Sequence, residues 1–367
     1  MSLALMQPAG VKEVQARGVR RGALGLAVCA VLLVLAMLAS LAIGPVTIAP
    51  ARVMEVLLAA LQGERAAGVR EAIVVLDIRL PRTLLGLLVG MALALGGALM
   101  QGIFRNPLAD PGLIGVSNGA AFAAVGWIVL GHHAVDALPA GLAALAGTAG
   151  LPFAAFIGAL LATVALYLIA TRDGRTSVAT MLFAGIAIGA LSGAGTGVMV
   201  FLASDQQLRD FTFWSFGSLG GSTFAKVWAA APFVVLLLLA ALPLARALDA
   251  IALGEAEAFH VGVNVQRTKR IAIAAVAAAV GAAVAMAGVI GFIGLVVPHL
   301  VRLALGPGHR VLLPASALLG GALLLGADVV ARTLVSPAEL PLGVVTAMMG
   351  APFFLGLLLR RRAALGG

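Results

Sequence analysis

Long apolar runs separated by short polar segments make up most of this chain. Mainly apolar runs recur from end to end, and most charges lie in the short segments between them. A bilayer core about 30 Å thick needs roughly 20 apolar residues per helix. The pattern predicts an all-α, polytopic membrane protein with ten transmembrane helices, near 23–43, 82–104, 112–130, 152–171, 178–203, 224–245, 271–289, 291–305, 312–331 and 341–359.

The segments outside these runs are short. We expect a cytoplasmic N-terminal segment over 1–22, a ten-helix domain over 23–359 and a basic cytoplasmic tail over 360–367. The stretch 137–150 is apolar but rich in glycine, and we place it outside the spans. The run 291–305 contains Pro298, which predicts a kinked or broken helix.

Composition and charge support this class and exclude others. Hydrophobic residues make up 62% of the 367 positions and charged residues only 11%, against about 25% charged in a soluble domain. The net charge of +9 does not indicate a nucleic-acid site, because a cytoplasmic N-terminus would place 16 of the 24 Lys and Arg on the cytoplasmic side. That bias predicts topology, with both termini in the cytoplasm. One cysteine, Cys29, excludes an intrachain disulfide.

Two predicted spans carry small residues at strict four-residue spacing. The second has Gly86, Gly90, Ala94, Ala98 and Gly102, and the fifth has Gly185, Gly189, Gly193 and Gly197. Such ridges let helix backbones approach closely in lipid, so helix packing alone explains them. The alternative is that the fifth span lines a pathway for a bulky cargo.

Ionisable residues are missing from the middle of the predicted spans, apart from His299 in the short eighth one. Ion-coupled transporters usually keep such groups there, and a membrane enzyme would need a polar constellation. None of the three lysines follows a glycine, so the chain has no Walker A motif. If transport is driven by ATP, another chain must hydrolyse it. We expect no metal site and no stably bound cofactor.

Several motifs occur in an order typical of one transporter family. They are residues 79–82 (RLPR), 101–119 (QGIFRNPLADPGLIGVSNG), 253–263 (LGEAEAFHVGV), 288–302 (GVIGFIGLVVPHLVR), 327–332 (ADVVAR), 339–347 (ELPLGVVTA) and 350–354 (GAPFF). Together they resemble the FecCD/BtuC-like permeases of ABC importers for vitamin B12, iron–siderophores and haem. The resemblance implies a type II importer in the inner membrane. It also implies a permease homodimer, two ATPase subunits that bind ATP and a periplasmic substrate-binding protein.

The resemblance also implies roles for residues at the two membrane faces. Residues 253–264 resemble the segment that docks in a groove of the ATPase, as a helix does in groove recognition. The residues concerned are Gly254, Glu255, Glu257, Phe259, His260 and Gly262. An ordinary solvated loop is the alternative interpretation.

Outer arginines and one inner asparagine match further family positions. Three arginines, Arg79, Arg82 and Arg332, match family positions that hold glutamates of the binding protein. Arginine suits this role because its guanidinium pairs bidentately with a carboxylate. Topology or lipid headgroups could explain them instead. Asn106 resembles the cytoplasmic gate, although asparagine at a helix end is also a common cap or turn residue.

The cargo prediction depends on the segment after the fifth span. That segment resembles the haem importers, which carry an arginine there, and Arg209 from two subunits could meet the two haem propionates. An ion pair of Arg209 with Asp205 or Asp210 is the alternative. Siderophore and vitamin B12 remain alternative cargos, and a proton-coupled transporter is a more distant one. His132 and His133 are treated as loop residues.

Overall fold

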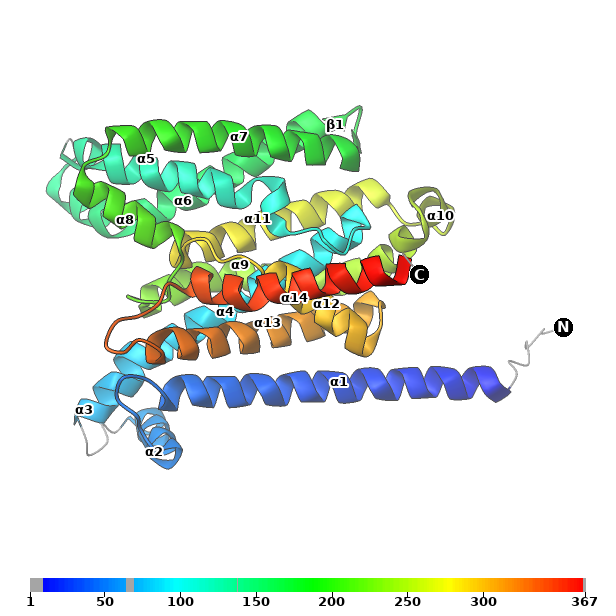
Figure 1. Ribbon diagram of the computed structural model, residues 1–367, viewed down its shortest axis with the longest axis horizontal. Helices are drawn as coiled ribbons and strands as arrows, with labels where there is room; N and C mark the ends of the chain where they lie inside the picture. The colour runs from blue at the N-terminus through cyan, green and yellow to red at the C-terminus, as the bar shows by residue number, and fades with distance from the viewer. Residues whose placement is uncertain (1–8, 64–68, 137, 366–367) are drawn as a thin grey trace.

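The described part of the chain folds into a bundle of helices with one short β-hairpin, whose two strands have two residues each (Figure 1). A computed structural model describes residues 9–63, 69–136 and 138–365. In chain order the elements are α1 (Ala9–Ala42), α2 (Pro50–Leu61), α3 (Val69–Ala72), the π-helix η1 (Ile73–Arg79), α4 (Leu80–Phe104), the 3₁₀ helix η2 (Pro111–Ile114), α5 (Val116–Asp136), α6 (Ala140–Ala170), β1 (Thr171–Arg172), β2 (Arg175–Thr176), α7 (Val178–Leu202), α8 (Asp205–Ser215), α9 (Phe224–Leu253), α10 (Glu255–His260), α11 (Val265–Ala287), α12 (Ile293–Leu305), α13 (His309–Thr333) and α14 (Leu342–Leu365).

Ten of these helices are the predicted spans. Within the described ranges, seven helices are long and apolar enough to cross a membrane: Arg20–Ala42, Arg70–Phe104, Ala140–Ala170, Val178–Leu202, Phe224–Leu253, Val265–Ala287 and His309–Thr333. Three shorter apolar helices complete the set: Val116–Gly131, Ile293–Leu305 and Leu342–Gly356. They follow the predicted order, so the all-α polytopic prediction is confirmed.

One predicted boundary is wrong. The stretch 137–150 does not lie outside the spans, because α6 begins at Ala140, after the extended Pro139. Its glycines are spread among Ala and Leu residues, which favour a helix, and glycine is common in membrane helices. The N-terminal segment is partly helical, because α1 begins at Ala9, but the apolar span within α1 begins only at Arg20, near the predicted position. Residues 1–8 and 366–367 lie outside the described residues.

Helix α4 forms the centre of the bundle, packed against α9, α11, α12 and α13. Most of its residues are buried. At Gly90 a Cβ atom would collide with the backbone of Gly320 in α13, and a Cβ at Gly320 would collide with Gly90. The ridge on the second span therefore serves close helix packing, as the small-residue spacing predicts.

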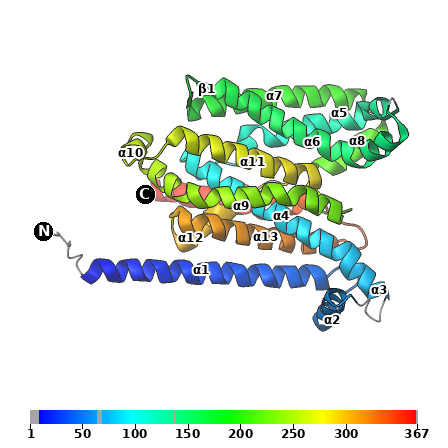
Figure 2. The ribbon, with the colours of Figure 1, turned by 180° about the vertical axis from the view of Figure 1, so that it is seen from behind.

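The bundle has two distinct ends. Helix α10 lies at one end with the start of α1 and the end of α14, and α2, α3 and α8 lie at the other (Figure 1, Figure 2). We call these the α10 end and the α8 end. Helices α1 and α7 lie at opposite edges, so α7 contacts only α5, α6 and η2 to any extent.

Candidate functional site

The candidate docking segment is the short helix α10 with a glycine on each side. Gly254 and Gly262 have φ angles of 144° and 84°, which residues with side chains rarely adopt. These turns project α10 from the bundle, and Phe259 is 72% exposed. Glu255, Phe259 and His260 line an open groove of about 870 Å³. An exposed aromatic residue beside acidic residues suits recognition by a partner.

A buried lysine fixes α10 to the rest of the α10 end. Lys269 in α11 is 1% exposed, and its Nζ donates to Glu255 Oε1 at 2.7 Å. The same Nζ donates to the Thr176 carbonyl oxygen at 2.9 Å. Gln266 Oε1 accepts from the Thr176 backbone N–H at 2.8 Å. The β1–β2 hairpin, which leads into α7, is thus tied to α10 and α11.

Asn106 lies just after α4, where the chain turns. Arg105 ends the helix in the left-handed conformation with φ 47°, and Asn106 Oδ1 accepts the Leu108 N–H at 3.0 Å. This is the turn role that asparagine often has. Asn106 also lines a pocket of about 260 Å³ with Arg302 and His309 at the α10 end. Its gate role stays a prediction.

The three arginines predicted to lie on the outer face are at the α8 end, but they are not free surface charges. Arg79, Arg82 and Arg332 are 3%, 8% and 3% exposed. Arg82 donates to both carboxylate oxygens of Glu339 at 2.8 Å and to Asp328 at 2.9–3.1 Å. In this conformation Arg82 is thus paired within the chain and not open to a partner's glutamates. The chain supplies its own carboxylates, and the docking role stays a prediction.

The neighbouring arginines complete this cluster. Arg332 Nε lies 3.4 Å from Asp328 Oδ2, and its Nη2 donates to the Ser40 carbonyl at 2.7 Å. Arg79 donates to the carbonyl oxygens of Leu41 and Ala42 at the end of α1 and to that of Val46 in the loop that follows. The hydrogen bond with Arg82 is the main cause that lowers the pKa of Glu339. The cluster joins α1, α4 and α13 with the segment before α14.

Arg209 lies on α8, which crosses the end of α7. Ser204 and Gln207 form a capping box that starts this helix. Arg209 is exposed, and its Nη2 donates to Gln206 Oε1 at 2.9 Å. Asp210 accepts instead from Gln206 Nε2 at 3.0 Å. Among the described residues no ion pair joins Arg209 to Asp205 or Asp210.

The glycine ridge of α7 divides into two halves. A Cβ at Gly185 or Gly189 would meet Leu113 or Asn118, so this half packs on η2 and α5. A Cβ at Gly193 or Gly197 would meet nothing within 4 Å. Packing explains the first half, and the half near α8 is open. The pathway role stays a prediction.

Sequence reasoning missed three residues that organise these sites: Asp328, Glu339 and Lys269. The spacing of Asp328 and Arg332, four apart on one helix, was a signal for an ion pair. No local spacing links Lys269 to Glu255, since they meet only in the folded chain. The side chains of His132, His133 and Arg360–Arg362 lie outside the described part of the structure.

Comparison with known proteins places these features in a family. The FecCD transport family matches residues 32–360. The chain is 47% identical over 292 residues to the hemin transport system permease protein HmuU of Yersinia pestis, covering 80% of this chain and 85% of that protein. It is 46% identical over 286 residues to the cobalamin import system permease protein BtuC of Halobacterium salinarum, covering 78% of this chain and 73% of that protein.

A third sequence relative and one solved structure agree with these matches. Identity to the vitamin B12 import system permease protein BtuC of Escherichia coli O9:H4 is 40% over 293 residues, covering 80% of this chain and 86% of that protein. A solved inward-facing structure of an ABC transporter described as metal-chelate type matches with a TM-score of 0.76 and 30% identity. It covers 91% of this chain and 98% of that chain. This chain belongs to the FecCD transport family and is a membrane permease, not an enzyme.

Proposed function

We propose that this chain is the permease subunit of a type II ABC importer that carries haem across the inner membrane. The observation that carries the proposal is the 47% identity to a hemin permease over four fifths of the chain. Because the sequence has no Walker A motif, a separate ATPase supplies the energy. Haem is cargo here and not a resident cofactor.

The geometry of the two ends supports the proposed partners. Two copies of the chain form the pathway, with the open half of α7 toward it. An ATPase docks on α10 in each copy, and a periplasmic binding protein docks at the α8 end. The start of α1 and the end of α14 share the α10 end, and the excess of basic residues supports a cytoplasmic location for that end.

Arg209 is the residue proposed to meet the cargo. Its guanidinium is exposed at the α8 end and bonded to a neutral amide, so its positive charge is available to an anion. Haem carries two propionates, and a homodimer would present two copies of Arg209. Charge-assisted bonds from arginine to carboxylate are among the stronger hydrogen bonds in proteins.

Vitamin B12 is the second candidate cargo, because a cobalamin permease is 46% identical to this chain. Cobalamin lacks the paired propionates, so its uptake would not depend on Arg209 in the same way. One uptake experiment with an Arg209 variant can therefore distinguish the two cargos.

The test is reconstitution of the permease with its ATPase and binding protein in liposomes. We expect ATP-dependent haem uptake that falls several-fold with Arg209→Gln. Arg70→Gln is a matched control, because Arg70 is also exposed near the α8 end. Cobalamin or siderophore uptake without haem uptake would overturn the cargo and leave the permease function intact.

A further inference from the structure

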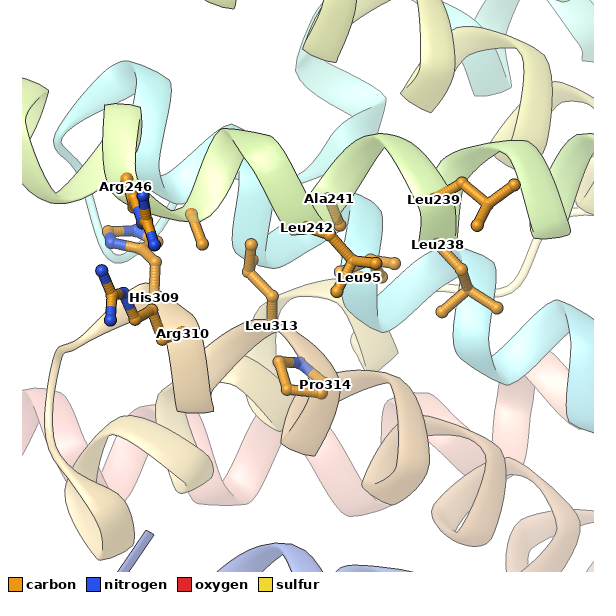
Figure 3. A pocket seen from close by; sticks show the side chains of 11 residues that line it. Leu95, Leu238, Leu239, Ala241, Leu242, Arg246, His309, Arg310, Leu313 and Pro314 are labelled. Atoms are coloured by element: carbon orange, nitrogen blue, oxygen red, sulfur yellow. The ribbon is translucent and has the colours of Figure 1, made fainter. Parts of the chain in front are cut away.

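A pocket of about 430 Å³ lies between α4, α9 and α13. Its walls are mainly apolar, from residues such as Leu95, Leu238 and Leu313. Arg246 and Arg310 lie together at one end of it, while Leu238 and Leu239 lie at the other (Figure 3). None of the family motifs falls in this pocket, and it is separate from α10, α8 and the glycine ridge of α7.

The two arginines at its end share a region with little negative charge. Both are exposed, and neither takes part in an ion pair among the described residues. Asp249 is the nearby carboxylate, and its Oδ1 is occupied by the His309 N–H at 2.9 Å and His309 Nδ1 at 2.7 Å. The two guanidinium groups carry like charges and repel each other. An anion bound between them would offset this repulsion and would itself be stabilised.

The rest of the pocket suits a hydrocarbon chain. Leu239 and Leu242 are 60% and 69% exposed on α9, which is one of the apolar helices long enough to cross a membrane. The distance along α9 from Leu238 to Arg246 is eight residues, or about 12 Å at 1.5 Å per residue. The side of the molecule on which the pocket opens is therefore in contact with acyl chains.

The depth of the arginines also fits a headgroup. Arg246 lies seven residues, or about 10 Å, before the end of α9 at Leu253. Arg310 is the second residue of α13. Both therefore lie at the α10 end of their helices, at the level where a span meets the interface. Basic pockets between membrane helices at this level bind anionic lipid headgroups.

We propose that this pocket is a binding site for an anionic phospholipid. The lipid phosphate lies between Arg246 and Arg310, held by charge-assisted hydrogen bonds. One acyl chain lies along Leu238, Leu239 and Leu242. The apolar wall selects a lipid over free phosphate, because only a lipid fills both parts of the pocket. The proposal goes beyond the transport function and does not depend on the cargo.

Native mass spectrometry of the purified full chain tests the site. Dioleoyl phosphatidylglycerol and dioleoyl phosphatidylethanolamine are titrated separately, since they share acyl chains and differ in net charge. We expect phosphatidylglycerol to bind more tightly, and the double variant Arg246→Gln/Arg310→Gln to bind it about tenfold more weakly. Arg172→Gln is the matched control, because Arg172 is an exposed arginine on the hairpin at the α10 end.

The outcomes separate the site from general surface charge. Equal binding of the two lipids by the unmodified protein would overturn the proposal without use of any variant. An equal loss in the Arg172 control would assign the effect to diffuse positive charge and would also overturn it. Displacement of the lipid by excess inorganic phosphate would show an anion site with no role for the acyl chain. Gel filtration of each variant checks its fold.

Discussion

Asp328 is the residue on which the charge cluster at the α8 end depends. It is 1% exposed and pairs with both Arg82 and Arg332, which also donate to Glu339 and Ser40 respectively. A buried guanidinium without its carboxylate is strongly destabilising. In this conformation the cluster therefore stabilises the packing of α1, α4 and α13, independently of any partner.

We expect Asp328→Asn to lower the free energy of unfolding by about 3–5 kcal/mol, the cost of breaking a buried ion pair. Thermal unfolding of the detergent-purified protein measures the change. Asp77→Asn is the control, because Asp77 is exposed near the same end and a surface charge contributes about 1 kcal/mol at most. Equal losses in the two variants would contradict the prediction.

Because Glu339 belongs to the same cluster, the stability that the cluster contributes depends on pH. Its pKa is lowered in the folded chain, first by the hydrogen bond with Arg82. A carboxyl with a lowered folded pKa stabilises the fold above its unfolded pKa of about 4.3. That contribution is lost as the pH falls through the lower folded pKa.

The corresponding test compares the unmodified protein with Glu339→Gln. We expect the unmodified protein to melt at a higher temperature near pH 7, and the difference to shrink as the pH falls below about 4.3. Other acidic groups titrate in both proteins, so the difference isolates Glu339. A constant difference from pH 7 to pH 3 would contradict the assigned cause.

At the scale of elements, Lys269 joins α10 to the hairpin that leads into α7. Its Nζ donates to Glu255 in α10 and to the Thr176 carbonyl oxygen in the hairpin, so one side chain connects the two segments directly. We expect Lys269→Met to speed amide hydrogen exchange in residues 255–263 and 171–176. The nearly equal length of methionine preserves packing while removing the charge. The contact between α10 and the hairpin before α7 can thus be broken by one substitution.

Arg267→Met is the matched control for this measurement. Arg267 lies two residues earlier in α11 and is exposed, so its loss should leave both segments unchanged. Faster exchange in the control alone, or in neither variant, would show that Lys269 does not hold the two segments together.

The same elements show what sequence reasoning could and could not reach. Long apolar runs predicted all ten spans, because the bilayer fixes the length and composition of a helix. The start of α6 was missed, since the glycines in this apolar run were read as loop residues, whereas the Ala and Leu residues around them favour a helix. The partners of Arg82 were missed for a different reason. Asp328 and Glu339 lie more than two hundred residues away, so only the fold brings them together.

At the scale of the whole molecule, α7 is the most exposed of the seven long apolar helices that the structure describes. It lies at the edge of the bundle (Figure 1), and Phe183 and Phe201 on it are 73% and 87% exposed. Lipid or a second copy must cover these residues. The proposed homodimer places the second copy there.

Distances between spin labels decide whether α7 faces a second copy. With Cys29 replaced by Ser, a cysteine at Gly197 carries one label per chain, and Gly197 has open space around it. The control is a label at Leu239, which is exposed on α9. If α7 lines the dimer, the Gly197 labels are closer together across the dimer by more than one helix diameter, about 10 Å. Gly197 labels as far apart as the Leu239 labels would instead place α7 against lipid, and the open half of its glycine ridge would then have no part in a pathway.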